Sequence, residues 1–198
     1  MQKMVCLGDS LTEGADVEKG FRWTSLAANA LGLEVINCGI GGDTTQGMLA
    51  RFYPEVVVRK PAFVVILGGT NDLWWGTPVN TILANIFSIV CQARYHDVTP
   101  MVGLPLPIDL LSVEQQGYAP PPDGYAQFPA RLDELGARLV SAASDSEVPV
   151  IDFNRDFRLV SGAVDRGLFL DDGLHPNRAG HAKMAAALIL RVRRVFHF

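Results

Sequence analysis

Short apolar runs alternate along the chain with longer segments in which apolar residues recur at helical spacing. Five runs have the length and composition of buried strands, at residues 4–7, 34–37, 63–67, 100–104 and 148–153. The longer segments predict helices at about residues 21–31, 44–53, 79–95, 125–144 and 178–195. Strands that are apolar on both faces and alternate with helices indicate a parallel sheet covered on both sides. The pattern therefore predicts a doubly wound α/β domain that spans residues 1–198.

One segment, at about residues 104–129, interrupts this alternation. It is rich in proline, and Tyr118, Tyr125 and Phe128 lie between the prolines. Proline at this density disfavours regular helix and central strand, so we expect a surface excursion over one edge of the sheet. Long loops in compact domains are often functional. The sequence leaves open whether the excursion is a variable connection or a lid or wall of a substrate site.

Composition narrows the class of protein. Hydrophobic residues make up 48% of the chain and charged residues 19%, which suffices for a substantial core. The formal net charge of −4 argues against nucleic-acid binding. The basic cluster of Arg191, Arg193 and Arg194 is expected to be the solvated face of a final helix, whose C-terminal dipole it complements.

The sequence also bears on location. No stretch approaches the roughly 18 apolar residues that span a bilayer, and the start lacks the pattern of a signal peptide. We expect a cytoplasmic protein without stable membrane insertion, and homo-oligomer formation stays open. Three cysteines show no metal-binding spacing. Cys6 and Cys91 are expected to be buried, whereas Cys38, beside a glycine-rich loop, is the one that has a candidate functional role.

Four polar clusters stand at the ends of predicted strands or before the last helix. They are residues 8–10, 37–44, 68–72 and 171–177. Because the carboxyl ends of parallel strands share one edge of a sheet, these clusters are expected to meet at one site. Each also has a purely structural explanation: a turn and helix cap at Ser10, an Asx-turn or cap at Asn71 and Asp72, and an N-cap at Asn177 that would leave His175 without a role.

Together the clusters supply the parts that acyl transfer needs. Ser10 follows a strand and is the candidate nucleophile, His175 the candidate base, and Asp172, three residues earlier, the group that orients the base. The backbone N–H groups of Ser10 and Gly42 and the side-chain amide of Asn71 are candidate donors to an oxyanion. A metal site at Asp171, Asp172 and His175 is disfavoured, because no further ligand occurs at a suitable spacing.

The same blocks, in this order, resemble those of the GDSL family of SGNH hydrolases, a group of serine esterases, lipases and thioesterases. They are Gly8-Asp9-Ser10-Leu11, the 39–44 loop with Gly42, Gly69-Thr70-Asn71-Asp72 and Asp172-Gly173-Leu174-His175. The resemblance covers nearly the whole chain. It implies a three-layer α/β/α, flavodoxin-like domain with strand order 2-1-3-4-5, the triad and oxyanion residues named above, and no required cofactor.

The substrate is less well defined. Trp74 and Trp75 follow the Asn71 block and are candidates to line an acyl or aromatic pocket, although at least one could equally belong to the core. We expect hydrolysis of small, neutral, short-acyl carboxylic esters through an acyl-enzyme. The alternatives are a long-chain acyl thioesterase or lysophospholipase and, in a different class, a flavodoxin-like module in which the 39–44 loop binds an anion without catalysis.

Overall fold

A computed structural model describes residues 2–14 and 16–196 of the chain. Five parallel strands form one sheet in the order β2-β1-β3-β4-β5. The strands are β1 (Lys3–Gly8), β2 (Glu34–Gly39), β3 (Phe63–Leu67), β4 (Thr99–Gly103) and β5 (Val150–Ile151). In the centre, Val5 of β1 lies opposite Ile36 of β2 and Val64 of β3. The predicted parallel sheet and the strand order implied by the resemblance are both confirmed.

Successive strand residues point to opposite faces of the sheet, and both faces are buried. Val5 and Leu7 belong to one hydrophobic core, whereas Met4 and Cys6 belong to the core on the other side. All four side chains are fully buried. This two-sided burial explains why the strands appear in the sequence as continuous apolar runs rather than as alternating patterns.

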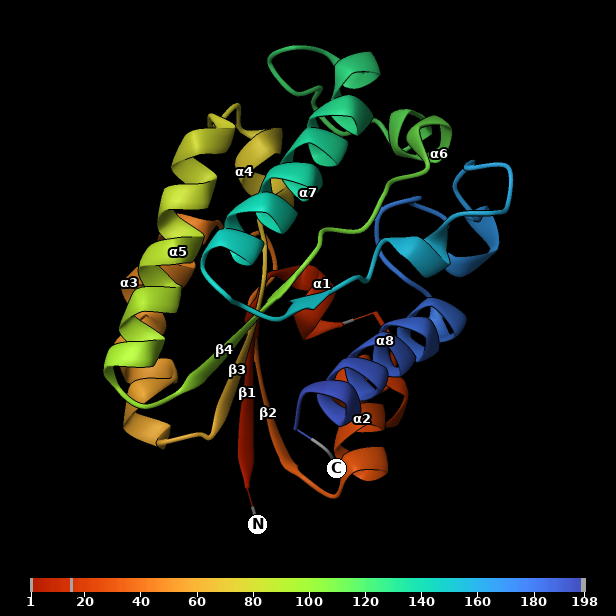
Figure 1. The fold of residues 1–198 in the computed structure, drawn as a ribbon. Helices are drawn as coiled ribbons and strands as arrows, with labels where there is room; N and C mark the ends of the chain where they lie inside the picture. Colours follow the sequence, from red (N-terminus) through yellow and green to blue (C-terminus); the bar gives the residue numbers. More distant parts are fainter. Residues whose placement is uncertain (1, 15, 197–198) are drawn as a thin grey trace.

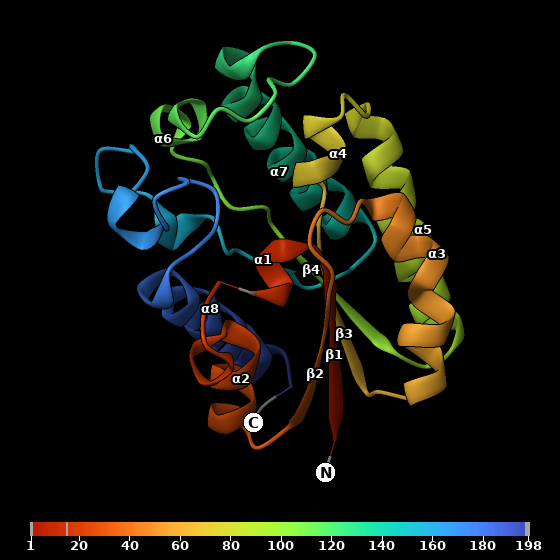
Figure 2. The ribbon, with the colours of Figure 1, turned by 180° about the vertical axis from the view of Figure 1, so that it is seen from behind.

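Helices form one layer on each face of the sheet (Figures 1 and 2). The first layer consists of α3 (Thr45–Glu55), α5 (Val79–Tyr95) and α7 (Phe128–Asp145). The second consists of α2 (Trp23–Leu31) and α8 (Arg178–Phe196), which pack against each other. The predicted three-layer α/β/α architecture is confirmed.

Three short helices follow strands near the carboxyl edge of the sheet (Figure 1). They are α1 (Ser10–Glu13), α4 (Thr70–Trp74) and α6 (Leu110–Gln115). Single 3₁₀ turns lie at Lys19–Phe21, Val57–Arg59, Tyr125–Gln127, Arg155–Phe157 and Arg166–Leu168. The short helices bring polar loop residues to the edge of the sheet at which parallel α/β proteins bind ligands.

Helix α6 lies inside the proline-rich excursion, where we expected no regular helix. Its six residues contain no proline, and Asp109 caps its first turn by accepting a hydrogen bond from the N–H of Ser112 at 3.2 Å. Proline stands only before and after this helix, at positions where it does not remove a helical hydrogen bond. The expectation that this segment contains no regular helix was wrong, because its prolines are not evenly spread and leave residues 110–115 free of proline.

Two expectations about single side chains were wrong. Cys91 is exposed, because it lies on the outer face of α5 while its neighbours Ile89 and Val90 point into the core. Arg191 is half-buried rather than solvated, and its Nε donates to the carbonyl of Val150 at 2.6 Å. Arg191 therefore ties α8 to β5.

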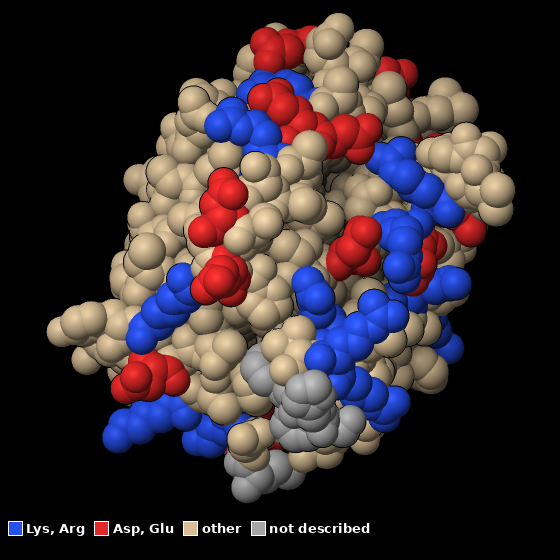
Figure 3. All heavy atoms as spheres, viewed as in Figure 1, with Lys and Arg blue, Asp and Glu red and all other residues tan. Residues whose placement is uncertain are grey.

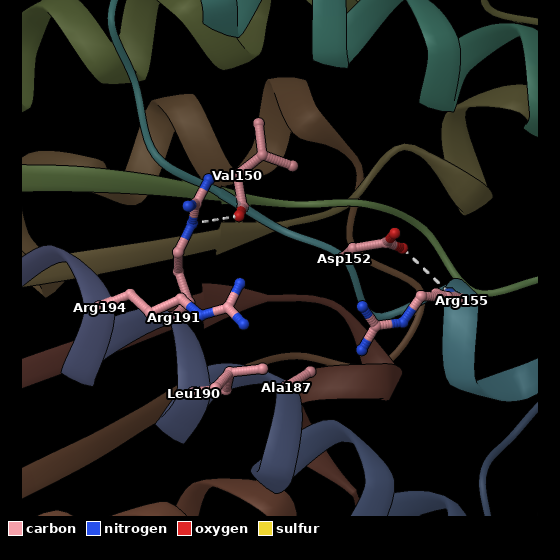
Figure 4. Close-up of a pocket in the computed structure, with 7 residues that line it drawn as sticks. All are labelled: Val150, Asp152, Arg155, Ala187, Leu190, Arg191 and Arg194. Carbon is pink, nitrogen blue, oxygen red and sulfur yellow. Dashed lines mark hydrogen bonds between the residues drawn. The ribbon is translucent and has the colours of Figure 1, made fainter.

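The end of α8 is the most basic part of the surface in view (Figure 3). Arg191 and Arg194 line a cavity of about 190 Å³ together with Asp152 and Arg155 (Figure 4). Two of these arginines have partners: Arg191 binds the carbonyl of Val150 in β5, and Arg155 pairs with its neighbour Asp156 at 3.0 Å. The cavity does not include the four polar clusters expected at the functional site.

Candidate active site

Ser10 is the first residue of α1 and follows directly on the turn that ends β1. Asp9 is the N-cap of this helix: its Oδ1 accepts a hydrogen bond from the N–H of Leu11 at 2.9 Å. Its backbone carbonyl accepts hydrogen bonds from Thr12 and Glu13. The helix cap that the sequence led us to consider at Ser10 is therefore supplied by Asp9, which leaves the Ser10 hydroxyl free for other contacts.

The side chains of Ser10, His175 and Asp172 form a continuous row of hydrogen bonds. His175 Nε2 lies 2.9 Å from Ser10 Oγ, and His175 Nδ1 lies 2.5 Å from Asp172 Oδ2. Asp172 Oδ1 accepts hydrogen bonds from the N–H groups of Leu174 and His175, each at 2.9 Å. Both carboxylate oxygens are thus engaged, and the imidazole is oriented with Nε2 toward the serine.

The loop that carries Asp172 and His175 is held from the side by the proline-rich excursion. Asp109 donates its N–H to the carbonyl of Gly173 at 2.8 Å. Gly173 has φ +69°, and a side chain there would meet the carbonyl oxygen of Asp109. Arg166 bridges the two segments, because it donates to Ser112 Oγ at 2.8 Å and to the carbonyl of Phe169 at 3.2 Å. The excursion therefore contacts the candidate site directly.

Asn177 caps α8, as the sequence allowed. Its Oδ1 accepts hydrogen bonds from the N–H groups of Ala179 and Gly180 at 2.9 and 3.1 Å. Its Nδ2 donates to the carbonyls of Gly167 and Phe169. This cap coexists with the hydrogen bonds of His175, so the two explanations of the 171–177 cluster do not exclude each other.

The surroundings of the row shift two pKa values in opposite directions. Burial lowers the pKa of His175, but the hydrogen bond and charge of Asp172, with the charges of Asp16 and Asp9, outweigh it and raise the pKa above its usual value. Burial raises the pKa of Asp172, and the hydrogen bonds from His175 and Leu174 overcome it and lower the net value. The geometry therefore favours a charged Asp172 beside an imidazole that accepts a proton readily.

The candidate oxyanion donors lie on separate loops linked by hydrogen bonds. Within the described residues, the N–H groups of Ser10 and Gly42 have no acceptor. Gly42 is exposed and has φ +75°, so a substrate group can approach its backbone closely. Asn71 Nδ2 donates to the carbonyl of Asp43 at 2.9 Å and lies 3.4 Å from Asp9 Oδ2. One amide hydrogen of Asn71 is thus firmly used and the other only weakly.

Sequence reasoning missed the parts that Asp9 and Asp72 play. Burial raises the pKa of the fully buried Asp9 to about 7, although the Leu11 N–H and the charge of His175 oppose this shift. Asp72 accepts hydrogen bonds from Thr45 N and Oγ1 at 2.9 and 2.6 Å, and so joins α4 to the start of α3. Neither Asn71 nor Asp72 caps α5, because Pro78 is its N-cap. Nothing in the sequence pairs residues so far apart.

The two tryptophans differ in their environments. Trp74 is half-buried, and its ring packs against Tyr118, Tyr125 and Phe128 of the excursion and the first turn of α7, with centroid distances of 6.3, 6.0 and 5.0 Å. Trp75 is 71% exposed. We call Trp74, Tyr118, Tyr125 and Phe128 the aromatic wall.

The aromatic wall adjoins the candidate site through α4, because this short helix carries both Asn71 and Trp74. Burial raises the pKa of the Tyr118 hydroxyl, and the negative charges of Asp172 and Asp16 raise it further.

The remaining candidate groups have structural partners. Cys38 Sγ contacts Glu55 Oε2 at 3.4 Å, and burial raises the pKa of its thiol to about 11, which makes it a poor nucleophile near neutral pH. His181 is buried and accepts a hydrogen bond from the N–H of Trp23 at 3.2 Å. Over residues 2–14 and 16–196, no group of three His, Cys, Asp or Glu residues is arranged to hold a metal ion. The same residues include no helix long and apolar enough to cross a membrane.

A parallel α/β sheet with a Ser–His–Asp row at its carboxyl edge is the arrangement of hydrolases that use a serine triad. The comparison with known families narrows this class. The chain belongs to the GDSL-like lipase/acylhydrolase family, whose sequence model matches residues 6–183.

Several relatives have names that refer to an activity. The chain is 23% identical over 214 residues to an acetylxylan esterase from Geobacillus stearothermophilus, covering 96% of this chain and 94% of the relative. It is 26% identical over 181 residues to thioesterase 1/protease 1/lysophospholipase L1 from Escherichia coli K12, covering 88% and 76%. The match to the uncharacterized lipoprotein YqeF from Bacillus subtilis, 31% identical over 120 residues, spans only 49% of that protein.

Solved structures agree with the fold. A lipase/acylhydrolase from Enterococcus faecalis superimposes with a TM-score of 0.77 at 25% identity, covering 98% of this chain and 96% of the other. A catalytic mutant of the Geobacillus acetylxylan esterase gives a TM-score of 0.77 at 20% identity, covering 96% and 94%. The match to the family model, over residues 6–183, confirms the expected membership of a hydrolase family.

Proposed function

We propose that this protein hydrolyses small carboxylic esters through an acyl-enzyme intermediate formed on Ser10. The observation that carries the proposal is the unbroken row from Ser10 Oγ through His175 to Asp172, with contacts of 2.9 and 2.5 Å. A serine hydroxyl becomes nucleophilic when a neighbouring base removes its proton during attack. The membership of a family of hydrolases supports this assignment.

In the proposed first step, His175 Nε2 takes the proton from Ser10 Oγ while this oxygen attacks the ester carbonyl carbon. The developing oxyanion accepts hydrogen bonds from the N–H groups of Ser10 and Gly42 and from Asn71 Nδ2. The imidazolium then gives its proton to the leaving alcohol as the C–O bond breaks. Asp172 stays charged and stabilises the imidazolium, in keeping with its lowered pKa.

In the second step, water attacks the acyl-enzyme. His175 removes a proton from this water, the second tetrahedral oxyanion occupies the same donors, and the imidazolium returns the proton to Ser10 Oγ as the acid leaves. The products are the carboxylic acid and the alcohol. The mechanism uses only groups of this chain and water.

The charges around the row support a neutral substrate. Asp9, Asp16 and Asp172 all act on His175, so the local field is negative. Arg51, which binds the carbonyl of Gly8 at the end of β1, is already paired with Asp43 at 2.7 Å. A phosphorylated substrate such as acyl-CoA would be repelled here.

The aromatic wall supports a short acyl group. Trp74 packs against three rings of the wall, and it stands on α4, the helix that also carries Asn71. The relative named acetylxylan esterase agrees with this preference, whereas the relative named thioesterase and lysophospholipase favours the alternative of a long acyl chain. We therefore keep long-chain thioester or lysophospholipid hydrolysis as the second candidate.

A profile of p-nitrophenyl esters from two to sixteen carbons separates these candidates. We expect kcat/KM to be highest at two to four carbons, and a maximum at ten or more would contradict the short-acyl proposal. His175→Ala should lower kcat about 10³-fold or more, because members of a triad act as a unit. His96→Ala, at the end of α5, is the matched control and should leave kcat unchanged.

The other expectations about partners stay predictions. They are a small-molecule ester as substrate, no nucleic acid, no stable membrane insertion, and a cytoplasmic location.

A further inference from the structure

Arg51 of α3 makes three hydrogen bonds in three directions from one guanidinium group. Its Nη2 donates to the carbonyl of Gly8 at 2.9 Å, its Nη1 to the carbonyl of Cys38 at 2.8 Å, and its Nε to Asp43 Oδ2 at 2.7 Å. The side chains of Arg51 and Asp43 are only 15% and 12% exposed. A planar fork of donors is suited to such a set of fixed acceptors, whereas an ammonium group is not.

The three acceptors belong to segments that carry the proposed catalytic groups. Gly8 ends β1 and lies two residues before Ser10. Cys38 lies near the end of β2, at the start of the loop that contains Gly42. Asp43 follows Gly42 directly, and its Oδ1 also accepts the N–H of Thr44 at 2.9 Å.

Asn71, the third donor of the proposed oxyanion hole, is connected to the same Arg51–Asp43 ion pair. The backbone carbonyl of Asp43 accepts the hydrogen bond from Asn71 Nδ2 at 2.9 Å. The carbonyl of Gly8, besides binding Arg51, accepts the N–H of Ile40 at 3.0 Å. Strand β1, the Gly42 loop and the Asn71 amide therefore meet through one guanidinium and its ion-pair partner.

We propose that Arg51 is a positioning residue that aligns Ser10, Gly42 and Asn71 as a single oxyanion hole. The inference rests on the proposed serine-hydrolase function, because an oxyanion hole has a role only if an oxyanion forms during the reaction. Arg51 does not contact the reacting atoms, since its donors are occupied by Gly8, Cys38 and Asp43. Arg51 instead fixes the positions of the three backbone segments that contain its acceptors.

The role follows from how steeply oxyanion stabilisation depends on geometry. Donors help only when they lie within hydrogen-bond distance of the oxygen as its charge develops. A displacement of about 1 Å caused by a remote substitution can cost about 10²-fold in rate. Loss of the guanidinium leaves the loop of Gly42 held by fewer contacts, and the effect is expected in kcat rather than in substrate binding.

The test compares Arg51→Met with Arg59→Met. Arg59 also pairs with a carboxylate, Glu55, at 2.9 Å, but it is exposed and donates to none of the three acceptors of Arg51. We measure kcat and KM with p-nitrophenyl acetate, and Tm to confirm folding. Arg51→Met should lower kcat about 10- to 100-fold with KM within about threefold, and Arg59→Met should change neither.

Two further variants separate positioning from charge and from folding. Arg51→Lys keeps the charge but not the fork, so its kcat should be closer to that of Arg51→Met than to that of the wild type. Asp43→Asn removes the ion pair and should lower kcat in the same way, which tests the proposal even if Arg51→Met does not fold. The pH of half-maximal kcat/KM should stay unchanged in Arg51→Met and Arg51→Lys, because the charges that act on His175 are those of Asp172, Asp16 and Asp9.

A folded Arg51→Met protein with kcat within about twofold of the wild type would overturn the inference, as would a loss confined to KM. These results are distinct from failure of the proposed function. If the wild type itself neither hydrolyses the ester nor reacts at Ser10, the function fails. If the wild type is active and the Arg51 and Asp43 variants are equally active, only the positioning role fails.

Discussion

His175 Nε2 lies 2.9 Å from Ser10 Oγ, although 165 residues separate the two in the chain. Ser10 is presented by the turn that ends the strand β1, and His175 by a loop before the last helix. On the far side of the imidazole, Asp172 holds Nδ1 at 2.5 Å. The fold therefore brings three side chains from its two ends into the order required for proton transfer from a serine hydroxyl.

Removal of the Asn71 amide tests the proposed oxyanion hole. Asn71→Ala should lower kcat about 10²- to 10³-fold with a modest change in KM, the size expected for one oxyanion donor. Asn80→Ala, an exposed position on α5, is the control. If the Asn71 change altered KM alone, Asn71 would be a substrate-binding residue and not an oxyanion donor.

The pH dependence of kcat/KM reports the protonation of the free enzyme. The proposed base must be neutral, and Asp172 raises the pKa of His175 against the effect of burial. The rate should therefore rise with pH, and its half-maximal point should lie above the value of about 6.5 that is usual for histidine. A flat profile from pH 5 to 9 would count against His175 as the base.

Asp9 complicates this profile, because burial raises its pKa to about 7 and its charge acts on His175. Asp9→Asn removes this second ionisation. Since the negative charge of Asp9 raises the pKa of His175, the half-maximal point should move to lower pH in the variant. A shift to higher pH would contradict the assigned sign.

The stability of the protein should depend on pH through His181. Burial, with the charges of Arg22 and His175, lowers the pKa of His181 to about 4. Its contribution to the free energy of unfolding is therefore complete above pH ~6.5 and is lost as the pH falls toward 4, a change of up to ~3 kcal/mol.

Urea denaturation at several pH values checks this, with His181→Gln for comparison. Glutamine does not titrate, so the wild type should lose stability relative to the variant between pH ~6.5 and 4. A constant difference between the two proteins across this range would show that His181 does not titrate on unfolding as we expect.

The two tryptophans should respond differently to substitution. Trp74→Ala removes a half-buried ring packed 5.0 Å from Phe128, so it should lower Tm and raise KM for esters. Trp75 is 71% exposed, and Trp75→Ala should leave Tm nearly unchanged. A raised KM for Trp75→Ala would show that this side chain lines the substrate site. An unchanged KM for Trp74→Ala would show that the aromatic wall does not bind substrate.

The main elements of the fold could be predicted because they are long or buried on both faces. The apolar run at Phe63–Leu67 and the helical pattern at Val79–Tyr95 match the structure residue for residue. The short helices could not be predicted, because four to six residues hold too little periodic pattern. Cys91 was misplaced for a related reason, since one step along a helix separates an inward position from an outward one.

The residues of the candidate site could be predicted by their chemistry, but the residues that support them could not. Ser10, Asp172 and His175 stand out as polar residues after strands or before a helix. Arg51 does not, because two of its three partners are backbone carbonyls, which every sequence offers. The cap at Asp9 and the contacts of Tyr118 depend likewise on how distant segments pack.

The most direct test of the account is the reaction of Ser10 with a fluorophosphonate, followed by intact-mass measurement. The wild type should gain the mass of one phosphonyl group, and Ser10→Ala should gain none. The control variant, Ser25→Ala, should be labelled like the wild type. Since Ser25 lies within α2 and has no part in the row, the control isolates the nucleophile. An unlabelled wild type, under conditions that label a known serine esterase, or a Ser10→Ala protein that still gains the adduct, would contradict the assignment of Ser10 as the nucleophile.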